Sequence, residues 1–314
     1  MTWRSLLFVP GDRPERMEKA LGLGADALIL DLEDAVAPAA KPAARDAVRA
    51  LVERAPGGPA LLVRVNPVTT EAFAADVAAL AGAPLIGVVL PKAEGRATVA
   101  ALRDALPGDY AVLPIATETP RGVFALGDYD GAGLAGLTWG AEDLPAAIGA
   151  LGSRDADGGY TDPYKVVRAL ALFAAHAAGV PAIETVYPDF RDLDGLAAYA
   201  ARGRRDGFTG MMAIHPAQVA VINAAFTPDE TELAAARRIV ALFEANPGAG
   251  ALQLDGRMVD APHLAAARRL LAAARPDKRA SERRSGAPSH HHSAAQPVPA
   301  HQPASTSDGQ CTPR

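Results

Sequence analysis

The feature that most constrains the fold is a regular alternation of short apolar runs with longer alanine-rich segments. Most runs are continuously apolar instead of alternating, which is typical of parallel strands buried on both faces of a sheet. The segments between them carry apolar residues near helical spacing. The eight runs cover residues 6–9, 27–30, 61–65, 86–90, 111–115, 134–138, 182–186 and 211–214.

Eight strand–helix units in a row predict a (β/α)8 barrel, the α/β fold in which a closed parallel sheet is surrounded by helices. A doubly wound open sheet is the alternative. It is less favoured, because no G-x-G-x-x-G turn stands between a strand and a helix, as dinucleotide binding would require. Helices are expected within residues 41–52, 73–80, 97–106, 165–178 and 196–201.

The C-terminal part of the chain departs from this alternation. Residues 227–230 start a predicted helix, Asp255-Gly256 predicts the tight turn of a hairpin, and residues 261–274 a last helix. After that, Pro, Ser, Arg, Gln and His dominate and little apolar surface is left to bury. We therefore expect a barrel over residues 1–226, an appended segment over 227–275 and a disordered tail over 276–314.

Composition narrows the class of partner. With 31 basic and 36 acidic residues the net charge is -5, which disfavours nucleic acid as a partner. The single cysteine, Cys311, excludes an internal disulfide and favours a reducing compartment. No apolar run approaches the length of a membrane span, and the N-terminus lacks the pattern of a signal peptide. We expect a cytoplasmic protein that binds neither nucleic acid nor membranes.

Two acidic residues follow apolar runs at the positions where a barrel keeps its active site. Glu118 comes after the fifth run and Asp143 after the sixth. Carboxylates at the C-terminal ends of parallel strands point into one mouth, where they can hold Mg²⁺ together with substrate oxygens and waters. Each also has a structural interpretation, since Asp143 could cap the following helix and Glu118 could pair with Arg121.

Other strand ends carry further candidates. Arg64 could clamp a carboxylate with its two-pronged guanidinium, or form a salt bridge with Asp31 or Glu33. Asp31, Glu33 and Asp34 place three carboxylates in four residues, and these need a cation, an arginine or hydrogen bonds to compensate them. His215 ends the eighth run, a position where histidine packs about as often as it acts in catalysis.

Taken together, these motifs resemble the citrate lyase β-subunit-like family, within the wider HpcH/HpaI aldolase and citrate lyase group. The resemblance extends over nearly the whole chain to about Ala274. It implies a (β/α)8 barrel, assembly into trimers or hexamers, and Mg²⁺-dependent cleavage of 3-hydroxyacyl-CoA thioesters such as citryl-, malyl- or citramalyl-CoA. The motifs that carry it are residues 4–11, 31–36 with Lys41 and Arg45, 63–66, 118–122, 140–144, 214–218 and 255–262.

The resemblance assigns roles residue by residue. It makes Glu118 and Asp143 the metal ligands and places Arg64 beside the reacting thioester. It makes Asp260 the acid that a neighbouring subunit supplies to protonate the acetyl-CoA or propionyl-CoA enolate, although an N-cap before Pro262 is the structural alternative. The residues assigned to coenzyme A are Phe8, Arg13, Lys19, Ile214 and His215.

Departures from the family pattern leave the acyl group open. Thr117 replaces an apolar residue, Glu184 replaces an aspartate, and Met211-Met212 replaces a Gly-Lys-type approach to the eighth strand end. The alternatives to a lyase are a hydroxyacyl-CoA thioesterase on the same scaffold, a citrate lyase β subunit acting on a carrier-bound acyl group, and a non-catalytic assembly subunit. A pyruvate-type class II aldolase is a weaker alternative, because its relatives place a histidine where this chain has Asp34.

Overall fold

The computed structural model describes residues 3–54, 57–156 and 158–274 of the 314-residue chain. The chain divides into two compact units after Ala235. The expected boundary after residue 226 remains a prediction. The expected disorder of residues 276–314 lies outside the described residues.

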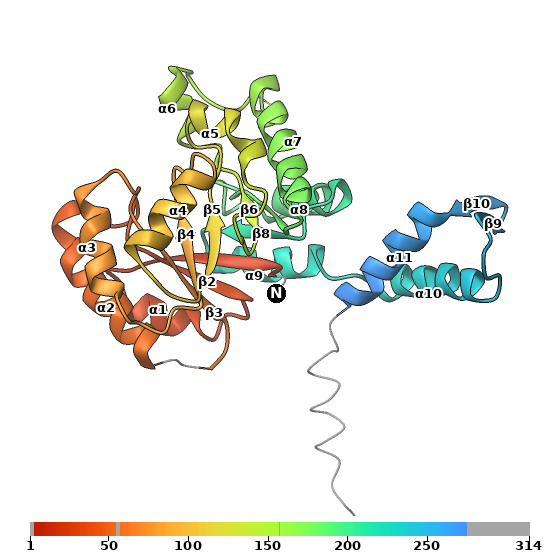
Figure 1. Cartoon of the computed structure of the whole chain (residues 1–314), viewed down its shortest axis with the longest axis horizontal. Helices are drawn as coiled ribbons and strands as arrows, with labels where there is room; N and C mark the ends of the chain where they lie inside the picture. The colour runs from red at the N-terminus through yellow and green to blue at the C-terminus, as the bar shows by residue number, and fades with distance from the viewer. Residues whose placement is uncertain (1–2, 55–56, 157, 275–314) are drawn as a thin grey trace, which may run out of the picture. The chain divides into compact units, whose positions relative to one another are not determined.

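The first unit contains an eight-stranded parallel sheet that curls into a nearly closed barrel (Figure 1). Strands β1 to β5 lie side by side in chain order, and β8 returns to pair with β1. A parallel bridge between Ile115 and Thr138 connects β5 to β6. The predicted (β/α)8 barrel is thus confirmed, in preference to the alternative of a doubly wound open sheet. The strands are β1 Ser5–Pro10, β2 Ala27–Asp31, β3 Ala60–Arg64, β4 Gly87–Leu90, β5 Ala111–Pro114, β6 Leu137–Thr138, β7 Ala182–Glu184 and β8 Gly210–Ala213.

Helices follow the strands and cover the outside of the barrel. Local caps fix several of them: the Thr70 hydroxyl accepts the N–H of Phe73 at the start of α3, and the Asp192 carboxylate accepts the N–H of Gly195 in α8. The helices are α1 Pro14–Ala20, α2 Lys41–Arg54, α3 Glu71–Leu80, α4 Arg96–Ala105, α5 Pro120–Phe124, α6 Leu144–Ile148, α7 Asp162–Ala177, α8 Leu193–Asp206 and α9 Pro216–Ala225, with 3-10 turns η1 Pro38–Ala40 and η2 Leu126–Asp128.

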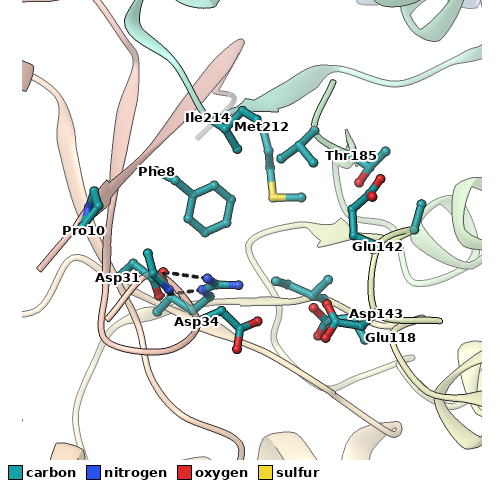
Figure 2. A pocket seen from close by; sticks show the side chains of 16 residues that line it. Phe8, Pro10, Asp31, Asp34, Glu118, Glu142, Asp143, Thr185, Met212 and Ile214 are labelled. Atoms are coloured by element: carbon teal, nitrogen blue, oxygen red, sulfur yellow. Dashed lines mark hydrogen bonds and ion pairs between the residues drawn. The ribbon is translucent and has the colours of Figure 1, made fainter. Parts of the chain in front are cut away.

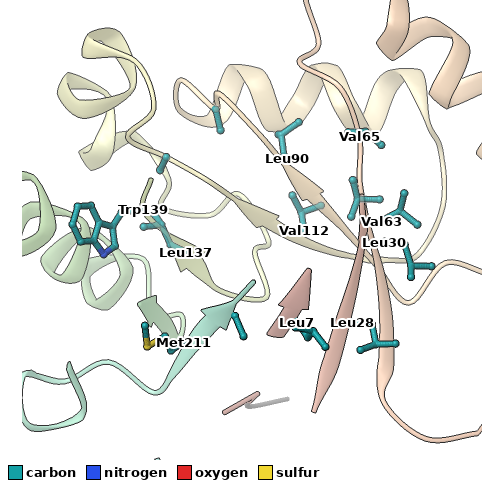
Figure 3. Packing of buried hydrophobic residues seen from close by; sticks show 14 of the residues in the cluster. Leu7, Leu28, Leu30, Val63, Val65, Leu90, Val112, Leu137, Trp139 and Met211 are labelled. Atoms are coloured by element: carbon teal, nitrogen blue, oxygen red, sulfur yellow. The ribbon is translucent and has the colours of Figure 1, made fainter. Parts of the chain in front are cut away.

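The strands bury both of their faces, which explains their continuous apolar runs. Leu6, Ile29 and Leu62 belong to a cluster inside the barrel. Their neighbours along the chain, such as Leu7 and Leu28, belong to a larger cluster that also contains residues of the surrounding helices (Figure 3). Two apolar layers therefore hold the strand ends, and the residues that follow them, in fixed positions.

The C-terminal part matches the predicted order of a helix, a hairpin and a last helix. It contains α10 Glu230–Glu244, the antiparallel strands β9 Ala251–Leu254 and β10 Arg257–Asp260, and α11 Ala261–Ala273. The hairpin turns at Asp255 and Gly256, which have φ angles of 51° and 78°. Positive φ at both positions is the two-residue turn that an Asp-Gly pair favours. Among the described residues, no helix is both long and apolar enough to span a membrane.

Candidate active site

A pocket of about 410 Å³ lies at the C-terminal ends of the barrel strands (Figure 2). Its lining divides by chemistry. The acidic residues are Asp31, Asp34, Glu118, Glu142 and Asp143, with the guanidinium of Arg64 among them. The apolar residues include Phe8, Ile115, Val186, Met212 and Ile214. The structure thus brings together the predicted metal ligands, the predicted arginine, and two of the five residues assigned to coenzyme A.

Glu118 follows β5 and is 4% exposed. One carboxylate oxygen accepts the backbone N–H of Lys92 at 2.5 Å. Burial, together with the nearby negative charges of Glu33 and Asp143, raises the pKa of this carboxyl to about 8. The alternative partner, Arg121, pairs with another carboxylate at 3.6 Å. The Glu118 carboxylate therefore faces the pocket with a shortage of positive charge around it.

Asp143 occupies the N-cap position of α6, as its alternative interpretation required. Its side chain nevertheless makes no capping hydrogen bond to α6, all of which lies in the described part of the chain. The nearest cation is the Lys92 ammonium, 3.5 Å from Asp143 Oδ1. The helix start positions this residue, and its carboxylate stays available to a ligand.

The two carboxylates fit a magnesium ion that keeps most of its coordination for water and substrate. Magnesium in enzymes is held by one or two protein carboxylates plus waters and substrate oxygens. Glu118 is buried near two further carboxylates, Glu33 and Asp143, so a further positive charge would be stabilised here. Within the described residues, no cluster of three or more His, Cys, Asp or Glu could hold a metal without such additional ligands.

Arg64 lies beside this acidic side, at the end of β3. Its Nε and Nη2 donate to the two oxygens of Asp31 at 2.7 and 2.6 Å, and Nη1 lies 2.9 Å from Glu33 Oε2. The guanidinium also covers the ring of Phe8 at 4.8 Å. The salt bridges to Asp31 and Glu33, which were the alternative interpretation of Arg64, are therefore present. They hold the arginine in the wall of the pocket and do not exclude it from the pocket.

Lys92 is the residue that sequence reasoning missed. It follows β4, and its ammonium lies 2.7 Å from Glu33 Oε1 as well as near Asp143. These carboxylates and Glu118 raise the pKa of the lysine. The sequence did contain a signal for it. Lys92 lies two residues after the fourth apolar run, and the other polar candidates were found at equivalent strand ends.

Comparison with known proteins identifies the family. Residues 4–216 match the family model described as HpcH/HpaI aldolase/citrate lyase. The chain belongs to this family. The match spans all eight barrel strands as far as the start of α9, so it includes each strand end that contributes to the pocket.

Several known proteins are similar to this chain over most of their length. A citrate lyase subunit beta-like protein of Mycobacterium tuberculosis is 43% identical over 260 residues, covering 82% of this chain and 90% of the relative. A (3S)-malyl-CoA thioesterase of Cereibacter sphaeroides is 37% identical over 270 residues, covering 85% and 92%. The mitochondrial citramalyl-CoA lyase of Rattus norvegicus is 31% identical over 285 residues, covering 83% and 82%.

A solved structure shows what a member of this family binds. The crystal structure of the protein CitE from Mycobacterium tuberculosis contains magnesium, acetoacetate and coenzyme A. It superposes on this chain with a TM-score of 0.74 at 40% sequence identity, covering 87% of this chain and 98% of that protein. Magnesium and coenzyme A are thus ligands of a relative with the same barrel.

The remaining residues assigned to coenzyme A lie outside the pocket lining. Arg13 and Lys19 are exposed at the start and in the last turn of α1, and Arg13 pairs with Asp12 at 3.7 Å. His215 caps α9, where its Nδ1 accepts the N–H of Ala217. Its ring also stacks on a phenylalanine at 4.8 Å between centroids. These residues could meet only the part of a ligand that extends out of the pocket.

Asp260 belongs to the second unit. It ends β10 and stands at the N-cap of α11, as its alternative interpretation required. Its Oδ1 lies 2.5 Å from Nδ1 of His263, and this contact lowers the pKa of the carboxyl. Its role in a neighbouring active site remains a prediction.

Proposed function

We propose that the chain is a Mg²⁺-dependent carbon–carbon lyase. Its substrate would be a 3-hydroxyacyl-CoA thioester of the malyl-CoA, citramalyl-CoA or citryl-CoA type, and its products a short acyl-CoA and an oxo acid. The observation that carries this proposal is the presence of Glu118, Asp143 and Arg64 in the lining of one pocket. The magnesium and coenzyme A in the related CitE structure support it.

Each of these residues has a chemical task in the cleavage. Glu118 and Asp143 would hold the ion, and bound Mg²⁺ supplies Lewis-acid polarisation of the substrate hydroxyl and carbonyl oxygens. The hydroxyl proton passes to solvent water, the carbon–carbon bond breaks to leave the oxo acid, and the electron pair of that bond remains on the acyl-CoA fragment as an enolate. Arg64 has five N–H donors, and those not used by Asp31 and Glu33 stabilise the enolate oxygen.

The reaction ends when the enolate carbon takes a proton. Phe8, Met212 and Ile214 make one side of the pocket apolar, which keeps bulk water from the carbanion. Asp260 from a neighbouring subunit would deliver the proton, or remove it in the condensation direction. This step requires an oligomer, and we propose a homotrimer or hexamer.

An exposed apolar stripe provides a surface for contact with a second copy. Val166, Leu170 and Phe173 are 56%, 44% and 65% exposed. They are spaced at i, i+4 and i+7 on α7, which places them on one face of the helix. Burial of such a stripe against another subunit would stabilise the assembly by removing apolar surface from water.

A thioesterase is the second candidate function, and the similarity to the (3S)-malyl-CoA thioesterase favours it. In that reaction water attacks the thioester carbonyl, and no carbon–carbon bond breaks. A carrier-bound acyl substrate is the third candidate, from the similarity to the citrate lyase subunit beta-like protein. The three differ in their products and in the thiol that carries the acyl group.

Product analysis separates them. The purified protein is incubated with Mg²⁺ and a panel of malyl-, citramalyl-, β-methylmalyl- and citryl-CoA, with and without chelator, and products are identified by mass spectrometry. Chelator-sensitive release of acetyl-CoA or propionyl-CoA with an oxo acid supports the lyase. Free CoA with an intact hydroxy acid supports the thioesterase, and absence of turnover with every thioester contradicts both.

A further inference from the structure

The charged side chains at the strand ends form an alternating chain of ion pairs. Arg64 joins Asp31 to Glu33, and Lys92 joins Glu33 to Asp143. The distances are 2.6–2.9 Å for all but the last pair, which is 3.5 Å. These ion pairs therefore connect Arg64, the arginine proposed to stabilise the enolate, to the proposed metal ligand Asp143 through Glu33 and Lys92.

Lys92 also contacts the other proposed metal ligand through its backbone. Its N–H donates to Glu118 Oε2 at 2.5 Å. Its φ angle is 49°, in the left-handed region that a non-glycine residue adopts only at an energetic cost. Such strain persists only where the surroundings hold it, and it clusters at functional sites. With this backbone conformation, Lys92 contacts both proposed ligands, Glu118 through its backbone N–H and Asp143 through its ammonium.

The charges of the group do not balance. Two cations face four carboxyl groups, and the carboxylates still outnumber the cations while Glu118 keeps the proton that its raised pKa favours. Among the described ion pairs, the Lys92 ammonium is the cation that lies within 4 Å of Asp143, and the backbone N–H of the same residue donates to Glu118. The carboxylates are Asp31, Glu33, Glu118 and Asp143, and the cations are Arg64 and Lys92.

We propose that Lys92 is a positioning residue whose ammonium competes with the divalent cation for Asp143. In the metal-free protein the ammonium neutralises Asp143 and Glu33 together. When the cation binds, like-charge repulsion moves the ammonium from Asp143, and it stays with Glu33, where it continues to hold Glu33 against Arg64. The longer contact to Asp143 is the one that is given up.

This inference rests on the proposed Mg²⁺ site, and two consequences follow from it. Free enzyme binds Mg²⁺ more weakly than its two carboxylates alone would allow, because the ion must displace a positive charge. Removal of the ammonium therefore has opposite effects on two quantities. Mg²⁺ affinity rises, while kcat falls, because Glu33 and Arg64 lose their support.

The test compares Mg²⁺ binding by isothermal titration calorimetry in wild type, Lys92→Met and Lys92→Arg at one pH and low ionic strength. We expect Lys92→Met to bind Mg²⁺ roughly three- to tenfold more tightly, the range for a charge lost a few ångströms from the ion in a half-exposed site. Lys92→Arg keeps the charge and should stay within about twofold of wild type. Thermal shift on Mg²⁺ addition gives a second readout.

Arg121→Met is the matched control. It removes a positive charge three residues after Glu118, but that charge pairs with Glu94 instead of either proposed ligand. Its Mg²⁺ affinity should not change, which separates a local effect of Lys92 from a general change in net charge. If Lys92→Met does not fold, Lys92→Gln carries the same measurement.

The negative outcomes have different meanings. If wild type binds Mg²⁺ and Lys92→Met binds it equally or more weakly, the competition is refuted and the metal site stands. If wild type itself binds no Mg²⁺ with or without substrate, the proposed function fails at its first step. A fall in kcat with unchanged Mg²⁺ affinity would reduce Lys92 to a structural support of Glu33 and would also refute the proposal.

Discussion

The hydroxyl of Thr117 makes two hydrogen bonds to one residue, donating to the carbonyl oxygen of Gly140 and accepting its N–H, both at 3.0 Å. This contact joins the segments that carry Glu118 and Asp143. It lies where a single bridge, between Ile115 and Thr138, connects β5 to β6. Thr117 departs from the apolar residue expected at this position, and it is fully buried. Its hydroxyl therefore sets the spacing of the two proposed metal ligands.

Thr117→Val should loosen this connection. The change keeps the shape of the side chain but leaves the two half-buried backbone groups of Gly140 without this partner, at a cost of about 0.5–1.5 kcal/mol in the free energy of unfolding. Mg²⁺ affinity should fall several-fold, because the two carboxylates lose their fixed spacing. Urea denaturation and Mg²⁺ titration measure the two effects. Thr117→Ser keeps the hydroxyl and should restore both; equal loss in both variants would show that packing alone matters.

The raised pKa of Glu118 predicts a pH-dependent stability. The unfolded chain loses this proton near pH 4.5 and the folded metal-free chain near pH 8, so the free energy of unfolding falls as pH rises between these values. Each pKa unit corresponds to about 1.4 kcal/mol. Metal-free Glu118→Gln should therefore melt several degrees above wild type beyond pH 8, and the difference should vanish below pH 4.5.

Magnesium should reverse this order. Added Mg²⁺ should raise the melting temperature of wild type at pH 8 and above, and leave Glu118→Gln unchanged, because the variant lacks one carboxylate ligand. Glu53→Gln, on the exposed face of α2, is the matched control and should follow wild type throughout. An equal response of both glutamine variants to Mg²⁺ would exclude Glu118 as a ligand.

Arg64→Lys should separate geometry from charge. Lysine keeps a positive charge but cannot make the parallel pair of hydrogen bonds to Asp31 while it also contacts Glu33. We expect kcat to fall by about 10²-fold, as when a donor to a developing oxyanion is lost. Steady-state kinetics measures this, with Arg49→Lys as the control, because this half-buried arginine of α2 also makes several hydrogen bonds but does not line the pocket. Wild-type kcat in Arg64→Lys would show that the arginine only stabilises the fold.

Much of the fold could be predicted from the sequence, because the barrel strands are buried on both faces and leave continuous apolar runs. The prediction was least accurate at the sixth run, where 134–138 was expected and only Leu137–Thr138 is strand. Gly136 and the residues before it approach β5 through isolated hydrogen bonds, such as Ala135 N–H to the carbonyl oxygen of Val112. Tertiary contact, and not local propensity, sets that boundary.

The site was predicted in part for a related reason. Carboxylates after apolar runs can be recognised from order along the chain, so Glu118 and Asp143 could be proposed as metal ligands from the sequence, and both line the pocket. The position of Lys92 after the fourth apolar run could be recognised, but its backbone contact with Glu118 and the pairing of Thr117 with Gly140 depend on the folded strand ends. Glu184 is similar, because its buried contacts with Trp139 and Arg168 form only when β7 packs against its helices.

Asp260 gives the prediction that tests the shared active site. Glu118→Ala removes a proposed metal ligand from the barrel, and Asp260→Ala removes the proposed acid from the second unit; each homomeric variant should be inactive. If Asp260 serves a neighbouring subunit, mixed oligomers contain sites with an intact barrel from one chain and an intact acid from another. Random mixing at equal amounts makes about a quarter of the sites complete, as expected for subunits combined independently in a closed ring.

Co-expression of the two variants with different affinity tags, followed by purification through both tags, measures this directly. Because purification through both tags removes the unmixed oligomers, activity near a third of wild type for a trimer, or near a quarter for a hexamer, would show that the site is built from two chains. No recovery in a mixed oligomer of confirmed composition would show that each chain must supply both residues, or that Asp260 only caps α11. The Asp260→Asn variant distinguishes these, since asparagine also caps a helix but cannot deliver a proton. If Asp260→Asn kept full activity, the acid would have to lie elsewhere.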